Sequence, residues 1–160
     1  MKAHTITLSY EEFEHTRELE PQYALLVEKA VEIAGKSYSP YSRFPVGAAV
    51  LLDDGRIFSG NNQENLSSPA GTCAERTVLN FVKANFPEST LVALAVTAPA
   101  STSGDPVTPC GICRQVITEM ESLQKTPIRL LLHKINGSTY RFENARDLLP
   151  LAFEEASLGK

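Results

Sequence analysis

The sequence predicts an α/β domain in which helices cover a β-sheet. Segments with the spacing of amphipathic helices alternate along the chain with short apolar or β-branched segments. The 160 residues, of which 42% are hydrophobic and 21% charged, are enough for one folded core. No repeat or low-complexity segment divides them. We therefore expect an N-terminal arm over residues 1–20 and a single domain over residues 21–160.

The chain begins with a weak strand pattern and a strong helix pattern. Residues 3–8 alternate loosely, which favours a short edge strand or an arm. Residues 21–36 predict an amphipathic helix that Pro21 opens and that ends near Gly35. Its apolar positions are Tyr23, Val27, Ala30, Val31 and Ala34.

A hairpin and a buried strand are predicted in the middle of the chain. Residues 46–52 and 56–61 form the hairpin, because the turn dipeptide Asp54-Gly55 lies between them. Residues 91–98 are a continuous apolar run, which indicates a strand buried on both faces.

Two further helices are predicted. The first covers residues 72–86, with Thr72 near its N-cap and with Cys73 and Glu75 in its first turn. The second follows a polar loop over residues 99–109. The apolar residues that share a face of this second helix are Ile112, Val116 and Met120.

The C-terminal part predicts two extended segments and a short helix. Residues 128–135 and 139–142 flank the turn Asn136-Gly137, and residues 148–153 follow as the helix.

Charge and composition exclude several classes of protein. The net charge of −4 and the absence of a basic stripe disfavour a nucleic-acid groove. The longest apolar runs are too short to cross a bilayer, and no targeting signal is visible, so we expect a cytoplasmic protein without membrane contact. Three cysteines in that compartment stay reduced, which points to metal binding or thiolate chemistry.

All three cysteines fall in two short motifs at predicted helix starts. Cys73 precedes Ala74-Glu75, and Cys110 and Cys113 lie three residues apart after Pro109. Their sulfurs can converge on one zinc ion and leave its fourth position to water. Three thiolates give such a site a net charge of −1, which two helix N-termini and the adjacent Arg76 can offset. Glu75 is then free to move protons to and from the water.

Simpler explanations exist for these residues. The cysteines could be small buried hydrophobes. A closed structural zinc site would need a fourth protein ligand, for which His4, His15 and His133 are the candidates. Glu75 alone could be a first-turn glutamate that favours the helix dipole.

The chain resembles the cytidine deaminases, specifically the small nucleoside-acting members with three cysteine ligands. The similarity covers about residues 21–155 and includes the zinc-deaminase pattern with a P-C-x-x-C motif. It implies a three-layer α/β/α fold with a central mixed sheet of about five strands. The similar blocks are SYSPYSRFPVGAA (37–49), GNNQEN (60–65), TCAERT (72–77), PCGICRQV (109–116) and LLPLAF (148–153).

The resemblance also implies a mechanism. Cys73, Cys110 and Cys113 are expected to hold Zn²⁺, and Glu75 to carry protons while hydroxide attacks C4 of a cytosine ring and ammonia leaves. The remaining expected contacts are the Ala74 N–H and the Thr108 carbonyl on the pyrimidine edge, Phe44 stacked on the base, and Asn62 and Glu64 on the ribose 3′-hydroxyl.

The expected reaction is the deamination of cytidine and 2′-deoxycytidine in pyrimidine salvage. Relatives of this type are usually homotetramers with shared sites, so Phe153 is a candidate contributor to a neighbouring subunit. Leu66-Ser67-Ser68 departs from the family pattern near the sugar's 5′ end, which keeps open a deaminase of another small amine, such as a modified nucleoside or a blasticidin-like compound. A non-catalytic zinc-stabilised module is a third hypothesis, and an editor of polynucleotides ranks lowest.

Overall fold

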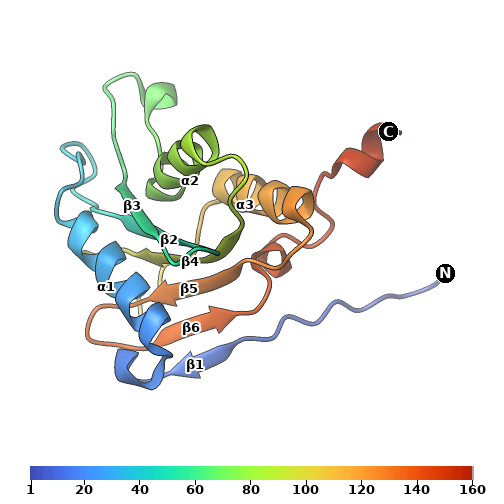
Figure 1. Ribbon diagram of the computed structural model, residues 1–160, viewed down its shortest axis with the longest axis horizontal. Coiled ribbons are helices and arrows are strands. Elements are labelled where there is room, and N and C mark those ends of the chain that lie inside the picture. Colours follow the sequence, from blue (N-terminus) through green and yellow to red (C-terminus); the bar gives the residue numbers. More distant parts are fainter. Residues whose placement is uncertain (160) are drawn as a thin grey trace.

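The computed structural model describes residues 1–159, and within them helices cover both faces of one mixed sheet (Figure 1). The strands are β1 (Glu11–Phe13), β2 (Gly47–Leu52), β3 (Ile57–Asn61), β4 (Leu91–Thr97), β5 (Arg129–His133) and β6 (Thr139–Phe142). The helices are α1 (Pro21–Ala34), α2 (Ala74–Asn85) and α3 (Gly111–Gln124), and the 3₁₀ turns are η1 (Thr16–Glu18), η2 (Ser68–Ala70), η3 (Ala145–Leu148) and η4 (Glu155–Leu158). The predicted α/β class is confirmed.

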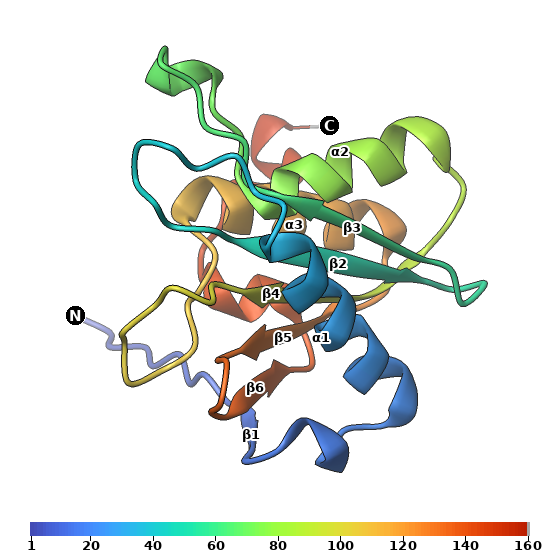
Figure 2. The same cartoon turned by 90° about the vertical axis from the view of Figure 1, so that its left-hand side faces the viewer.

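The sheet has the strand order β1-β6-β5-β4-β2-β3. Strands β4 and β5 run parallel, and the other neighbours run antiparallel. As predicted, β2 and β3 form a hairpin, and β4 is buried along almost its whole length. Figure 2, turned by 90°, shows α1 against one face of the sheet and α2 with α3 beyond the other.

The described part of the sheet has six strands, where about five were predicted, and the extra strand is β1. For residues 3–8 a short edge strand or an arm was predicted, and these residues are exposed and carry no regular structure. Arg141 on β6 explains the actual position of β1. It forms ion pairs with Glu11 and Glu20 and lies 4.9 Å from the centre of the Phe13 ring. Contacts far apart in the chain thus select a strand that alternation does not reveal.

Two hydrophobic cores separate the layers. One lies between α1 and the sheet, and the other lies between the sheet and the pair α2 and α3. Ile112 was predicted to face the core from α3 but is 63% exposed, and the buried face carries Cys113 and Ile117 instead. Val116 and Met120 are only partly buried at the edge of this core. The buried face of α3 is therefore rotated from the predicted face toward Cys113 and Ile117.

Glu121 is a buried carboxyl at the end of α3. Its Oε2 accepts hydrogen bonds from the backbone N–H groups of Ile128, at 2.8 Å, and Ala145, at 3.0 Å. Burial raises the pKa of Glu121 above its usual value. This side chain therefore ties α3 to the chain on both sides of β5 and β6.

The helix predicted over residues 148–153 is wrong in position. The helical turn there is η3, which ends at Leu148, and residues 152–154 lack regular structure. Pro150 opposes a longer helix because it has no N–H to donate. No described helix is long and apolar enough to span a bilayer.

Candidate metal and substrate site

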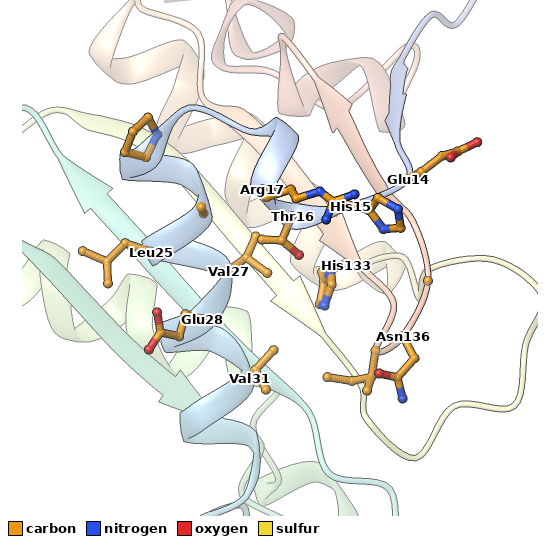
Figure 3. Close-up of a pocket in the computed structure, with 14 residues that line it drawn as sticks. Glu14, His15, Thr16, Arg17, Leu25, Val27, Glu28, Val31, His133 and Asn136 are labelled. Carbon is orange, nitrogen blue, oxygen red and sulfur yellow. The ribbon is translucent and has the colours of Figure 1, made fainter.

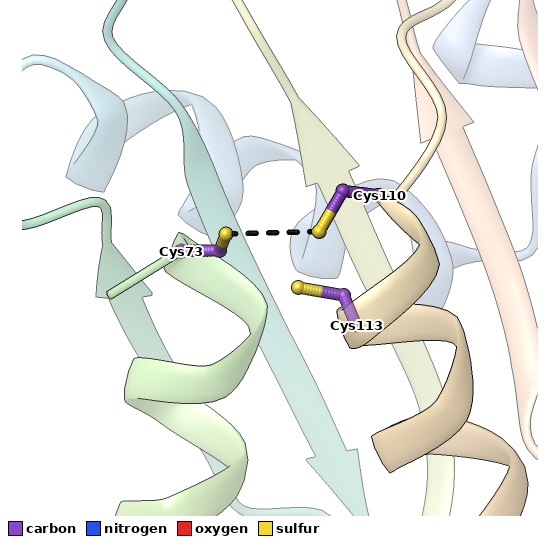
Figure 4. A group of neighbouring side chains, drawn as sticks. All are labelled: Cys73, Cys110 and Cys113. Carbon is purple, nitrogen blue, oxygen red and sulfur yellow. Dashed lines mark hydrogen bonds between the residues drawn. The ribbon is translucent and has the colours of Figure 1, made fainter. Parts of the chain in front are cut away.

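The three cysteines meet where α2 and α3 begin. Cys73 is the N-cap of α2, Cys110 is the N-cap of α3, and Cys113 lies in the first turn of α3. Their Sγ atoms all lie within 4.8 Å of one another, and those of Cys73 and Cys110 are 3.9 Å apart (Figure 4). The predicted convergence of the two motifs is confirmed.

This geometry fits a zinc ion. Zinc–sulfur bonds of about 2.3 Å in a tetrahedron place sulfurs roughly 3.8 Å apart, close to the Cys73–Cys110 separation. Among the described residues this is the one group of three or more such ligands close enough to hold a metal, and it includes no histidine. The closed zinc site with a histidine as fourth protein ligand is therefore not formed by the described residues. Cys113 is buried, whereas Cys110 is exposed, so one side of the group is open.

The thiols of Cys73 and Cys113 have pKa values that shift in opposite directions. A hydrogen bond from Cys113 lowers the pKa of Cys73 to about 5, and Arg76 contributes to the same shift. The same contact, together with burial, raises the pKa of the Cys113 thiol. Arg76 also donates to the carbonyl of Gly71 at 3.3 Å. The positive charge expected beside the sulfurs is present.

Glu75 is a buried carboxyl in the first turn of α2, two residues after Cys73. It is 4% exposed, and Ala74 beside it is fully buried. Burial raises the pKa of Glu75 above its usual value, and the nearby Cys73 raises it further. A carboxyl in this position can exchange protons more readily near neutral pH than an exposed one.

A cavity of about 510 Å³ opens beside Cys73. Asn62 and Glu64 line it together with Cys73, so three predicted site residues share one space. Phe44 and Thr108 do not line this cavity. Leu66 and Ser68, which depart from the family pattern, do.

Asn62 and Glu64 brace the neighbouring loop. The Asn62 side chain accepts from the Val46 N–H at 2.8 Å and donates to the Phe44 carbonyl at 3.0 Å. The Oε2 atom of Glu64 accepts from the N–H groups of Tyr41 and Ser42. Hydrogen bonding, first from the Ser42 hydroxyl, lowers the pKa of Glu64. Glu64 is therefore an anion at neutral pH, and Phe44 is held beside the cavity through Asn62.

Arg114 lies directly after Cys113, and the sequence did not predict its contacts with the loop before Cys110. Its guanidinium donates to the Pro109 carbonyl at 2.8 Å, to the Thr108 hydroxyl at 2.9 Å and to the Leu148 carbonyl at 3.1 Å. The only signal in the sequence is its place directly after Cys113, which says nothing about these partners.

A larger cavity lies elsewhere. It measures about 950 Å³ and is lined by residues of α1, by His15 and by the buried His133 (Figure 3). Burial lowers the pKa of His133, whose Nδ1 lies 2.9 Å from the Thr139 hydroxyl. None of the site residues implied by the resemblance lines this cavity, so size alone does not identify the chemical site.

Known proteins are similar to this chain in sequence. The family model described as the cytidine and deoxycytidylate deaminase zinc-binding region matches residues 21–128. A cytidine deaminase of Halalkalibacterium halodurans is 39% identical over 129 residues, which cover 81% of this chain and 92% of the relative. One from Mycobacterium tuberculosis is 42% identical over 103 residues, which cover 62% and 74% of the two chains.

Solved structures share the fold. The crystal structure of cytidine deaminase from Burkholderia pseudomallei superposes with a TM-score of 0.70 at 38% identity, covering 81% of this chain and 97% of the other. That of the enzyme from Mycobacterium tuberculosis gives 0.64 at 34% identity, covering 84% and 98%. With its cysteine group inside the matched region, the chain belongs to the cytidine and deoxycytidylate deaminase zinc-binding family.

Proposed function

We propose that this protein is a zinc-dependent cytidine deaminase that converts cytidine and 2′-deoxycytidine to the corresponding uridines and releases ammonia. The observation that carries the proposal is the convergence of three Sγ atoms within 4.8 Å, beside the buried Glu75 and the cavity of Asn62 and Glu64. Relatives that share this sequence over most of their length are cytidine deaminases.

Cys73, Cys110 and Cys113 are the proposed zinc ligands. When bound, zinc supplies the Lewis acidity that makes water a nucleophile near neutral pH. The two helix N-termini and Arg76 stabilise the thiolate charge, which keeps the sulfurs deprotonated for metal binding. The exposed side of the group leaves room for water and for the substrate ring.

Glu75 is the proposed proton carrier. Its carboxylate takes a proton from the attacking water and delivers it to ring N3, which makes C4 more electrophilic. After the water oxygen has bonded to C4, Glu75 takes the remaining proton from that oxygen and passes it to the exocyclic amine. The C4–N bond then breaks as the C4=O bond forms, which gives ammonia and a uracil ring. The raised pKa of this buried carboxyl suits a group that must both accept and donate.

The substrate is held from two sides. The Ala74 N–H and the Thr108 carbonyl bind the pyrimidine edge, and Phe44 stacks on the base. Asn62 and Glu64 bind the ribose 3′-hydroxyl. Because Glu64 is an anion, it accepts a hydrogen bond from a neutral sugar but repels a phosphate, so nucleosides are favoured over nucleotides.

Assembly and location complete the proposal. By family likeness the chain forms a homotetramer in the cytoplasm, with Phe153, which is 64% exposed, available to a neighbouring subunit. The net charge of −4 argues against polynucleotide substrates.

The test combines metal analysis with turnover. Purified protein should contain zinc and should convert cytidine to uridine with one ammonia per uridine. Glu75→Gln should retain zinc and lose at least about a thousandfold in kcat, since it keeps the size of the side chain but cannot carry protons. Cytidine monophosphate should be turned over far more slowly than cytidine. Zinc without turnover in the unmodified protein would refute the proposal.

A further inference from the structure

The loop before the second cysteine motif has little backbone support of its own. In the described chain, residues 102–109 make no backbone–backbone hydrogen bond. Pro106 and Pro109 cannot donate one at all. The first part of the loop is held by side chains, such as the Tyr140 hydroxyl, which donates to Asp105 at 2.7 Å. The last part, Thr108 and Pro109, is held by Arg114.

The Arg114 side chain donates hydrogen bonds to three acceptors that come from two parts of the chain. Its Nε and Nη2 atoms bind the end of the loop, through the Pro109 carbonyl and the Thr108 hydroxyl. Its Nη1 atom binds the Leu148 carbonyl, at the end of η3. Only a planar guanidinium presents donors in these three directions at once, and a lysine ammonium on its flexible stem cannot replace it.

We propose that Arg114 is a positioning residue, which sets the Thr108 carbonyl at the pyrimidine edge and ties that segment to the C-terminal turn. The inference rests on the proposed function, because it assigns the Thr108 carbonyl to the substrate. The proposal gives Arg114 no contact with the substrate or the metal. Among the described residues the Thr108 side chain has no other hydrogen-bond partner. Loss of Arg114 therefore releases the segment that carries the Thr108 carbonyl, which weakens substrate binding more than the chemical step.

Arg114→Lys is the principal test, with Arg129→Lys as the matched control. Arg129 is the first residue of β5, and its side chain binds the Glu143 carboxylate, at 2.8 Å, and the Tyr23 hydroxyl. Neither partner is a proposed site residue. Arg114→Lys should raise the KM for cytidine about tenfold or more and change kcat by less than about threefold, as expected for the loss of charge-assisted hydrogen bonds that position a binding group. Arg129→Lys should leave both constants within about twofold, and both variants should retain zinc.

Two measurements separate positioning from folding. Cytidine binding by calorimetry in a Glu75→Gln background should weaken by the same factor as KM rises. Thr108→Val removes one of the three acceptors while keeping the size of the side chain, and it should raise KM about threefold. Combined with Arg114→Lys it should add less than that factor, because the two changes remove a shared contact. Thr108→Val also tests the inference if Arg114→Lys does not fold.

The outcomes are distinguishable. Absence of turnover in the unmodified protein refutes the proposed function. If the unmodified protein is active, two results overturn the positioning role of Arg114. One is an unchanged KM in Arg114→Lys, and the other is a full addition of the effects of Arg114→Lys and Thr108→Val on KM. Loss of zinc in Arg114→Lys overturns it as well, since the residue would then support the metal motif and not the carbonyl.

Discussion

Gly60 on β3 determines how closely α2 approaches the sheet. A Cβ atom at this position would lie 2.9 Å from the Val78 nitrogen, 3.1 Å from the Val78 Cβ and 3.2 Å from the Thr77 Cγ2. The nearest of these atoms belongs to the helix backbone, so it cannot rotate aside. Because Cys73 caps the same helix, we expect Gly60→Ala to disturb the metal site as well as the core.

The size of the effect follows from these distances. Ordinary contacts begin at 3.4 Å, so α2 must retreat by about 0.5 Å. Overpacking of this kind destabilises the folded protein by about 1–3 kcal/mol. Alanine also lowers the conformational entropy of the unfolded chain, which stabilises the folded protein by about 0.4–1 kcal/mol. A net loss of about 1–2 kcal/mol lowers the Tm of a domain of this size by roughly 2–8 °C. Zinc–ligand distances tolerate only about 0.2 Å, so zinc affinity should fall about tenfold or more.

Chelator competition measures the zinc affinity, and thermal unfolding measures the stability. Gly104→Ala is the control, since a Cβ there meets nothing within 4 Å. Gly47→Ala is the second comparison, because its Cβ would lie 2.0 Å from the Ala30 carbonyl of α1, away from the cysteines. It should cost about 3 kcal/mol or more and leave the zinc affinity of the folded protein unchanged. If Gly60→Ala binds zinc as tightly as Gly104→Ala, the coupling between β3 and the metal site is refuted.

Three further predictions concern other groups. Glu121→Ala should destabilise the protein by about 2–4 kcal/mol in chemical denaturation, because it strands two buried N–H groups, whereas Glu121→Gln keeps the accepting oxygen. Because burial raises the pKa of Glu121, the folded state retains a proton that the unfolded state releases. The stability of the unmodified protein relative to Glu121→Gln should therefore fall as pH rises from about 4 towards neutrality. A difference in stability that does not change with pH would contradict this. Arg141→Gln should release β1 and cost about 1 kcal/mol, seen as faster proteolysis within residues 1–20, and equal cleavage rates would argue against the ion pairs. In metal-free protein at pH 6.5, Cys73 should be alkylated faster than an ordinary thiol because its pKa is about 5. Added zinc should slow this alkylation, as measured by mass spectrometry of the labelled peptide. An equal rate of labelling with and without zinc would contradict the prediction.

The sequence predicted the elements whose signal is local. The hairpin of β2 and β3 has a turn dipeptide, α1 has a clear apolar period, and the cysteine motifs stand at helix starts, so all three follow from nearby residues. The strand β1 does not, because its residues Glu-Glu-Phe have no alternation and pair with β6 through Arg141, 130 positions away from Glu11. The buried face of α3 was misjudged because the prediction followed Ile112, Val116 and Met120, whereas Cys113 and Ile117 are the residues that point inward.

Asn62 and Glu64 show where family likeness and structure each supply part of an answer. Likeness assigns them to the ribose, whereas the structure shows both holding the loop that carries Phe44. The two functions are compatible. The Asn62 amide has a second proton and further lone pairs, and the backbone N–H groups of Tyr41 and Ser42 bind only the Oε2 atom of Glu64. A sugar hydroxyl can therefore bind without breaking a contact to the loop. On the proposed assignment, a substitution of Asn62 should release the proposed base-stacking ring together with the proposed sugar contact, so its effect on KM should exceed that of one lost hydrogen bond. We therefore propose that the sugar end of the site is a single unit, in which recognition and loop structure depend on the same side chains.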